Sequence, residues 1–91
     1  TLHPFDTEQE AIDIANGTRY GLAGSVWTSD LEKGQRVAEG IDTGMVWVNC
    51  WLHRDLRVPF GGVKNSGVGR EGGRYSLEFF SEPTSICLME P

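Results

Sequence analysis

The spacing of apolar and polar positions predicts a helix near the start of the chain. Thr7 and Glu10 have the spacing of a capping box, in which the side chain before a helix accepts a hydrogen bond from the first turn. Asn16 and Gly17 supply a stop. Between these signals, the apolar residues recur at helical spacing: Ala11, Ile12, Ile14 and Ala15.

A strand, a helix and a second strand follow. GLAGSVWT, residues 21–28, is rich in β-formers near its end, and GMVWVNC, residues 44–50, is a continuous apolar run. Such a run suits a strand that is buried on both faces of a parallel sheet. Ser29 and Glu32 repeat the capping pattern and predict a helix that ends at Gly40. The order implies a crossover, so the predicted fold class is α/β, with short parallel strands and covering helices.

The second half of the chain is less regular. Residues 49–69 show no periodicity and are dominated by glycine and proline, which indicates a long irregular segment of the kind that often carries function. REGGRYSLEFF, residues 70–80, is compatible with a last helix that buries three aromatic side chains: Tyr75, Phe79 and Phe80. Pro83 stops this helix, and TSICLM, residues 84–89, is expected to form a closing strand.

Charge narrows the range of partners. The 91 residues suffice for one compact unit, and the net charge of -5 argues against nucleic acid or an anionic membrane. Basic residues nevertheless gather in the second half of the chain: Arg54, Arg57, Lys64, Arg70 and Arg74. An anionic ligand would bind there, unless this run is only a solvated loop.

Two cysteines are too few for a disulfide framework, and no signal sequence or long apolar run is present. We therefore expect a soluble, cytoplasmic protein. Cys50 ends an apolar strand with no evident base beside it, so we expect a buried structural thiol rather than a nucleophile. Cys50 and His53 have C-x-x-H spacing, but two ligands do not close a zinc site, and no metal site is predicted.

The glycines of residues 59–73 resemble a nucleotide cradle only in their spacing. Gly67, Gly69 and Gly72 match G-x-G-x-x-G, but that fingerprint needs a buried strand directly before its first glycine, and residues 62–66 cannot form one. The phosphate-loop pattern fails too, because Val68 and Gly69 stand where Lys and Ser or Thr are required. No cofactor-binding residue is therefore predicted in this chain, and the glycines are expected to permit positive φ angles.

Several linked motifs in register resemble the aldehyde dehydrogenase superfamily. They run in order along essentially the whole chain: Tyr20-Gly-Leu, Gly44 to Asn49, Pro59-Phe-Gly-Gly, Lys64, Ser66-Gly and Gly69-Arg-Glu, before an aromatic-rich helix. The resemblance is to the C-terminal part of the catalytic domain. Within the family, NCWLHRDLRVPFGG is most similar to the dehydrogenases that act on 2-hydroxymuconic and 2-aminomuconic semialdehydes.

The resemblance implies NAD(P)-dependent oxidation of an aldehyde to an acid. In the family, a cysteine thiolate adds to the carbonyl, hydride passes to nicotinamide, and a glutamate-activated water hydrolyses the thioester. The nucleophile, the general base and the domain that binds NAD or NADP lie upstream in the family. We therefore expect this chain to be a fragment without catalytic residues, inactive alone. Residues 1–82 would be part of the catalytic domain and 83–91 an oligomerisation strand.

The resemblance also implies a substrate entrance lined by the loop before Pro59. The Phe60 ring would form part of its wall, and the guanidinium of Arg54, midway along the loop, can bind a carboxylate through two parallel hydrogen bonds. Arg57 is a second candidate, although either arginine could instead pair with Asp55 or another acid on the surface. Trp51 and Leu52 would form an apolar wall beside the conjugated chain of such a substrate. Alternatively, both are ordinary packing residues.

Glu71 has two possible roles. The simpler role is to cap the last helix, since a carboxylate near a helix start is favoured by the helix dipole. In the family, the glutamate of the Gly-Arg-Glu motif is discussed as an outer member of a proton path to the general base, which implies a role in deacylation. Asn49 is expected to fix the loop by hydrogen bonds, as are Lys64 and Ser66.

The resemblance implies a small-molecule aldehyde as substrate and a homodimer or homotetramer formed through the C-terminal strand. Residues 84–89 have the apolar character to pair with a neighbouring subunit, or they could form an internal edge strand. Two functions therefore remain open. The chain is either the substrate-loop and oligomerisation end of a semialdehyde dehydrogenase or a self-standing dimerisation or binding module without catalytic activity.

Overall fold

Both predicted N-terminal helices form, and the first begins at its predicted cap. In the computed structural model, which describes residues 1–91, α1 spans Glu8–Asn16 and the Thr7 hydroxyl accepts a hydrogen bond from the Glu10 amide at 3.1 Å. The Glu10 carboxylate accepts a hydrogen bond from the Asp6 amide at 2.8 Å. Two backbone donors at the helix start are satisfied in this way, although the Glu10 carboxylate bonds to the residue before the N-cap and not to the N-cap amide of a standard capping box.

The second helix has a different cap from the one that the sequence pattern predicts. α2 spans Leu31–Gly40, and its N-cap is Asp30, whose carboxylate accepts a hydrogen bond from the Lys33 amide at 3.0 Å. The prediction of Ser29 as the cap is therefore wrong. A carboxylate suits this position because it satisfies an amide and also interacts with the positive end of the helix dipole.

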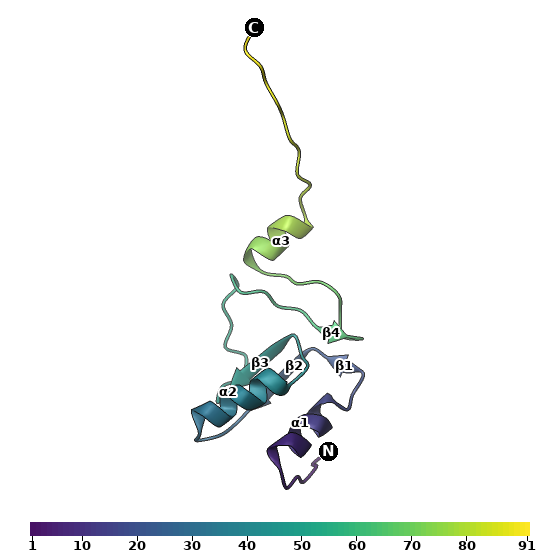
Figure 1. Cartoon of the computed structure of the whole chain (residues 1–91), viewed down its shortest axis with the longest axis vertical. Coiled ribbons are helices and arrows are strands. Elements are labelled where there is room, and N and C mark those ends of the chain that lie inside the picture. Colours follow the sequence, from purple (N-terminus) through teal and green to yellow (C-terminus); the bar gives the residue numbers. More distant parts are fainter.

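The parallel strand-helix-strand unit is confirmed. β2 (Ala23–Val26) and β3 (Met45–Val48) pair in parallel, and α2 connects them and lies against them (Figure 1). Burial is lower than predicted, since Trp47 is the only buried residue of β3 and the others are half-buried. The expectation of a strand buried on both faces is wrong for this chain, because a two-stranded sheet has too few neighbours to cover both faces.

The segment after β3 is irregular except for one short strand. β4 (Val63–Lys64) pairs in antiparallel orientation with β1 (Tyr20–Gly21). The other regular feature is an isolated antiparallel bridge between Phe60 and Glu71. The expected irregularity of residues 49–69 is thus confirmed outside these short pairings.

Lys64 and Ser66 tie this segment to the end of α1 and to β1, as predicted. The Lys64 ammonium donates hydrogen bonds to the carbonyl oxygens of Asn16 and Thr18, each at 3.2 Å. The Ser66 hydroxyl accepts a hydrogen bond from the Gly21 amide at 3.0 Å. A cation beside the last carbonyls of a helix also interacts favourably with the helix dipole.

A third helix forms where the sequence predicts one, but it does not bury its aromatic side chains. α3 spans Gly73–Phe79, after Gly72 and Gly73 with φ of 101° and 49°, values that favour glycine. The predicted burial of the aromatic residues is wrong, because their exposed fractions reach 73% and 84% at the end of the helix. In this chain α3 stands beyond the body that holds the strands, so those side chains face solvent (Figure 1): Tyr75, Phe79 and Phe80.

Residues 81–91 form an extended tail that projects away from the body (Figure 1). None of them belongs to a helix or strand, and the chain is 74 Å long in its longest dimension. The alternative of an internal edge strand is therefore wrong, because a strand needs a partner for its backbone hydrogen bonds. The predicted oligomerisation strand over residues 83–91 stays a prediction.

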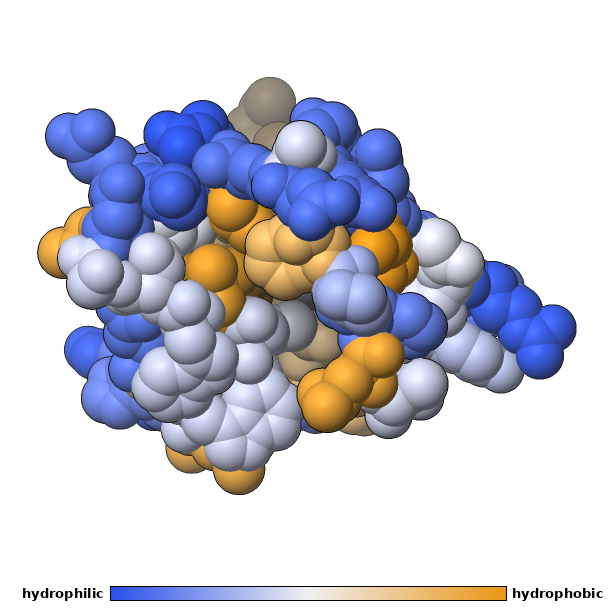
Figure 2. Space-filling view, turned by 90° about the horizontal axis from the view of Figure 1, so that it is seen from below, coloured by the Kyte–Doolittle hydropathy of each residue, from blue (hydrophilic) through white to orange (hydrophobic).

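Much apolar surface stays exposed in this chain. Figure 2 shows hydrophobic side chains gathered around a hollow in the face seen from the N-terminal end, beneath a rim of hydrophilic ones. Large apolar side chains such as Trp27, Phe79 and Leu88 are exposed. No helix is both long enough and apolar enough to cross a lipid bilayer.

An exposed ion pair links the two N-terminal helices. The Arg36 guanidinium donates two hydrogen bonds to the Glu8 carboxylate, at 2.7 and 2.9 Å. These bonds hold the pKa of Glu8 below its ordinary value. The Asn16 side chain joins the other ends of the helices, donating to the Gly40 carbonyl and accepting from the Asp42 amide, both at 2.8 Å.

We expect Glu8→Gln to lower the free energy of unfolding at neutral pH by a small amount. A lowered folded-state pKa stabilises the fold above the unfolded pKa, about 4.5, and this contribution is lost as the pH falls through the lowered folded value. The difference between wild type and Glu8→Gln should therefore shrink on acidification, as measured by urea unfolding at several pH values. Glu90→Gln, on the exposed tail, is the control, and a difference that persists at low pH would contradict this assignment.

Candidate functional site

The candidate site is built on the loop that follows β3. Asn49 begins this loop with a φ of 54°, and its side-chain oxygen accepts a hydrogen bond from the Thr28 amide at 2.8 Å. Its own amide donates to the Val26 carbonyl at 2.8 Å. The predicted role of Asn49 in fixing the loop is confirmed, because both bonds attach the loop to the end of β2.

Arg54 lies directly over an aromatic ring. The carbon at the centre of its guanidinium is 4.0 Å from the centroid of the Phe60 ring, a cation–π arrangement that also covers the ring from water. The Arg54 side chain is 31% exposed, and its N–H donors make no hydrogen bond to the rest of the chain. The structure thus brings together two residues that the family resemblance assigns to a substrate entrance.

Glu71 is the third member of this group. One carboxylate oxygen lies 3.8 Å from a terminal nitrogen of Arg54, which is an ion pair beyond hydrogen-bond distance. Glu71 is placed by its backbone, since its amide and carbonyl exchange hydrogen bonds with those of Phe60 at 2.7 and 2.8 Å. The bridge therefore places Phe60 and Glu71 beside each other, and both side chains lie near the same guanidinium.

The predicted helix-capping role of Glu71 is wrong. The N-cap of α3 is Gly72, and no side chain caps this helix. The Gly72 amide instead donates a hydrogen bond to the Ser76 hydroxyl at 2.7 Å. The Glu71 backbone is held in the bridge to Phe60, and its carboxylate lies beside Arg54. The role in a proton path stays a prediction.

A small cavity of about 190 Å³ lies at this group. Met45 of β3 lines one side, and Arg54, Val58 and Phe60 of the loop line the other. His53, Asp55 and Pro59 complete the lining, so the mainly apolar surface carries one cation and one carboxylate. The Asp55 carboxylate is paired with Arg57, and the Arg54 cation suits a ligand with a hydrocarbon chain and an anionic end.

Arg57 has a partner within the loop. Its guanidinium pairs with Asp55 at 2.5 Å, and the Arg57 side chain is 88% exposed. Hydrogen bonds from Arg57 hold the pKa of Asp55 below its ordinary value. Arg57 does not line the cavity beside Arg54. Its charge is therefore matched in the free chain, whereas the donors of Arg54 remain available.

Trp51 and Leu52 lie outside the cavity lining. The Trp51 ring meets the Trp47 ring edge-to-face, with centroids 4.9 Å apart, and Leu52 is exposed with a φ of 57°. Trp51 therefore packs on the body of the fold. Their predicted role as an apolar flank for the substrate stays a prediction.

One contact of this loop is not predicted by the sequence pattern. The Trp47 indole N–H donates a hydrogen bond to the His53 carbonyl at 2.8 Å. Trp47 is 4% exposed, and a buried indole N–H normally has a hydrogen-bond partner. This general rule predicts that the indole has a partner. It does not identify which carbonyl accepts the bond or which path the loop takes.

The two cysteines differ in their exposure to solvent. Cys50 is half-buried, Cys87 is exposed, and both are free thiols. The predicted full burial of Cys50 is therefore wrong within this chain. No three His, Cys, Asp or Glu side chains lie close enough together to hold a metal ion.

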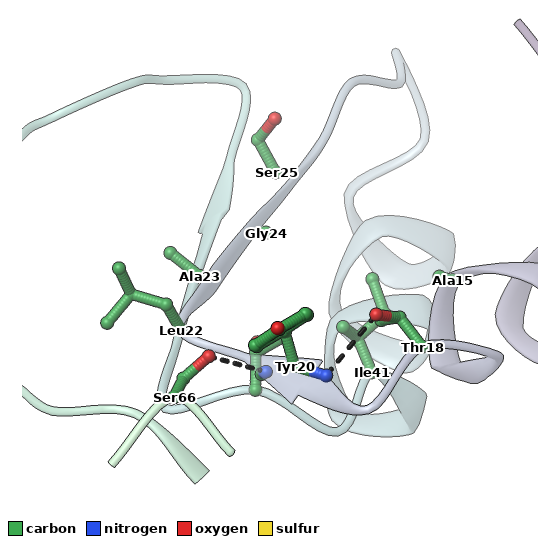
Figure 3. Close-up of a pocket in the computed structure, with 11 residues that line it drawn as sticks. Ala15, Thr18, Tyr20, Leu22, Ala23, Gly24, Ser25, Ile41 and Ser66 are labelled. Atoms are coloured by element: carbon green, nitrogen blue, oxygen red, sulfur yellow. Dashed lines mark hydrogen bonds between the residues drawn. The ribbon is translucent and has the colours of Figure 1, made fainter. Parts of the chain in front are cut away.

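A second cavity, of about 330 Å³, lies beside β1 and β2 (Figure 3). Its walls include Leu22, Ala23 and Ile41, and two hydroxyls point to backbone amides at its edge: Ser66 to that of Gly21, and Thr18 to that of Tyr20. No acidic or basic side chain lines it. The Thr18 and Ser66 hydroxyls are thus used in fixing the backbone of β1.

The residues present do not fit a dinucleotide. The strand before Gly67 is β4, which has two residues and runs antiparallel to β1, whereas the dinucleotide fingerprint needs a buried parallel strand that turns into a helix. α3 begins only after Gly72, which serves as its N-cap. The glycine spacing therefore forms a turn at a close backbone contact, since a Cβ on Gly72 would lie 2.6 Å from the Val58 carbonyl oxygen.

Comparison with known proteins gives consistent matches. The sequence profile of the aldehyde dehydrogenase family matches residues 1–86. The 2-hydroxymuconic semialdehyde dehydrogenase of Pseudomonas putida is 54% identical over 87 residues, which are 96% of this chain and 18% of that protein. The chain therefore spans about a fifth of the length of such curated relatives.

Solved structures agree with these matches. An aldehyde dehydrogenase of Mycobacterium tuberculosis, crystallised with NAD+, has a TM-score of 0.81 and 52% identity, covering 87% of this chain and 16% of that one. The betaine aldehyde dehydrogenase of Staphylococcus aureus in complex with NAD+ has a TM-score of 0.80 and 49% identity, covering 84% and 15%. Relatives named for different aldehydes are thus about equally similar, and overall identity does not identify a substrate.

Proposed function

This chain belongs to the aldehyde dehydrogenase family, and we propose that it supplies the substrate-binding segment of an enzyme that oxidises a carboxylated, muconic-type semialdehyde to the acid. The single observation that carries this proposal is the state of Arg54. Its guanidinium is partly buried on the Phe60 ring, yet none of its N–H donors is used within the chain. Such a guanidinium can bind a carboxylate by donating two parallel hydrogen bonds to it.

The surroundings of Arg54 support an acidic substrate. Phe60 holds the guanidinium plane and partly excludes water, which strengthens its attraction for an anion. Glu71, at 3.8 Å, neutralises the cation only loosely because its side chain is 68% exposed. A substrate carboxylate could therefore hydrogen-bond to Arg54 without displacing an existing hydrogen bond.

The chemical step is proposed to take place outside this chain. The chain spans about a fifth of the length of its relatives, and its glycines do not fit a dinucleotide. We place the nucleophile, the general base and the NAD or NADP site in a preceding part of a longer protein. Residues 1–82 would then be the C-terminal part of its catalytic domain. The two free thiols of this chain support a cytoplasmic location.

We expect the 91-residue chain alone to reduce no NAD or NADP with any aldehyde. The mass of the native gene product, or the codons upstream of Thr1, tests the proposal directly. A longer product with a dinucleotide domain and a cysteine nucleophile supports it. Aldehyde-dependent reduction of NAD by the purified chain, followed by absorbance, would overturn this division of roles.

A second candidate is a self-standing dimerisation or binding module. The exposed tail favours it, because Ile86, Leu88 and Met89 are almost fully accessible on a segment with no partner strand. The same tail, residues 83–91, would serve as the oligomerisation strand of a homodimeric or homotetrameric enzyme. A native product of 91 residues that self-associates without catalysing aldehyde oxidation would favour the module.

A further inference from the structure

We propose that Trp47 is a positioning residue that sets the location of the Arg54 guanidinium, and through it the selectivity for carboxylated aldehydes. This inference rests on the proposed function. It depends on one hydrogen bond, from the Trp47 indole N–H to the His53 carbonyl at 2.8 Å.

The bond acts on the backbone of Arg54 itself. The His53 carbonyl belongs to the same planar peptide unit as the Arg54 nitrogen. Holding the oxygen therefore fixes the orientation of the bond that leads to the Arg54 Cα. A small rotation of this peptide would move the guanidinium, at the end of a long side chain, away from the Phe60 ring that it now covers at 4.0 Å.

No other hydrogen bond holds this part of the loop. Asn49 attaches the start of the loop to β2, and bonds from Arg57 and Val58 to Asp55 shape its far side. Residues 50–54 make no backbone hydrogen bond to the body, so the indole bond is the one directed contact between these two anchors. The edge-to-face contact of Trp51 with Trp47 adds packing, but it restricts the orientation of the loop less than a hydrogen bond does.

Trp47 is suited to this task because it is buried within a paired strand. It lies in β3 opposite Ser25 of β2 and is 4% exposed, whereas the other two tryptophans, Trp27 and Trp51, are exposed. Through its hydrogen bond, the buried ring thus attaches the irregular loop to the parallel strand pair. A binding group on a loop is accurate only when a rigid element holds it.

The test compares Trp47→Phe with wild type in the full-length enzyme, using a carboxylated and a neutral semialdehyde of similar length. Phenylalanine keeps an aromatic ring in the buried site and removes the indole N–H. We expect the KM for the carboxylated aldehyde to rise about threefold to tenfold, the effect of one hydrogen bond, with kcat unchanged. The KM for the neutral aldehyde should stay within about twofold.

Trp27→Phe is the matched control, because the exposed Trp27 makes no hydrogen bond through its indole and lies outside the Arg54 cavity. It should change neither KM. Adding Trp47→Phe to Arg54→Ala should have no further effect on the ratio of the two KM values, because no guanidinium remains to be positioned. A purely structural role of Trp47 would instead reduce activity toward both aldehydes, with or without Arg54.

A direct measurement covers the case in which Trp47→Phe folds poorly. In the unmodified enzyme with isotope-labelled tryptophan, the Trp47 indole N–H should exchange with solvent more slowly than those of Trp27 and Trp51. Equal exchange rates, or equal effects of Trp47→Phe on both aldehydes while Arg54→Ala discriminates between them, would overturn this inference alone. Equal effects of Arg54→Ala on both aldehydes would overturn the proposed function, and this inference with it.

Discussion

Replacing Arg54 with alanine is expected to raise the KM of the full-length enzyme for a carboxylated aldehyde by about tenfold to a hundredfold. The magnitude follows from losing hydrogen bonds to a charged group, about 1.5–3 kcal/mol, at tenfold per 1.4 kcal/mol. The KM for a neutral aldehyde of similar length should change little, because it has no group for the guanidinium to bind. Steady-state kinetics with both substrates measures the difference.

Two further arginine variants separate charge from geometry. Arg54→Lys keeps the cation but not the planar pair of donors, so its KM should fall between wild type and Arg54→Ala. Arg74→Ala is the control, because Arg74 forms an exposed ion pair with Glu78 on α3, a kind of pair that contributes little. Equal increases in KM for the charged and the neutral substrate in Arg54→Ala would remove Arg54 from the site.

Arg57 provides an internal comparison within the same loop. Its guanidinium is already bonded to Asp55 and exposed to water. Binding a substrate carboxylate would require it to break or share these bonds, whereas Arg54 has unused donors. The two arginines are indistinguishable by residue type, and their difference arises from the path of the loop between them.

Local sequence signals predicted the elements of the body well. The capping pattern of Thr7 located α1, and the apolar run around Trp47 located β3 and its parallel pairing. These features depend on residues a few positions apart, so a single sequence contains them. The cap of α2 was misplaced by one residue because Ser29 and Asp30 both have cap-forming side chains, and only the backbone path decides between them.

Burial was predicted less well, and the reason is physical. The apolar pattern of Phe79 and Phe80 indicates that these side chains favour removal from water, but not which surface removes them. In this chain they are exposed, as is the tail beyond them. A pattern of apolar residues cannot distinguish a contact within the chain from one with another domain or subunit.

The arrangement of the candidate site could not be predicted from the sequence. Arg54 and Phe60 were both expected at the entrance, and the structure adds that one covers the other. Glu71 was expected as a cap, yet the backbone bridge places it beside Arg54. Such contacts depend on how an irregular loop closes, and that closure has no periodic signature in the sequence.

A close backbone contact makes Gly44 the position where a single methyl group should have the largest effect on stability. A Cβ built on Gly44 would lie 1.5 Å from the carbonyl oxygen of Gly61 and 3.2 Å from the Cα of Gly62. Gly44 cannot easily move away from Gly61, because the Gly44 amide donates a hydrogen bond to the Gly21 carbonyl at 3.1 Å. We expect Gly44→Ala to lower the free energy of unfolding by about 3 kcal/mol, at the upper end for overpacking, because backbone atoms must separate.

Gly69→Ala is the matched control for this prediction. A Cβ on Gly69 would meet nothing within 4 Å, and its φ is not in the left-handed region. This change should leave the free energy of unfolding unaltered or raise it by about 0.5 kcal/mol, because alanine reduces the entropy of the unfolded chain. Urea unfolding of wild type and both variants gives the comparison, and similar midpoints for Gly44→Ala and Gly69→Ala would contradict the proposed contact.

The Gly44 contact also couples stability to the site. Gly61 directly follows Phe60, so separating the Gly44 and Gly61 backbones shifts the ring beneath Arg54. In Gly44→Ala enzyme that remains folded at low temperature, the KM for a carboxylated aldehyde should therefore rise more than that for a neutral one. Loss of stability with an unchanged ratio of the two KM values would show that the backbone contact supports the fold without setting the position of Phe60.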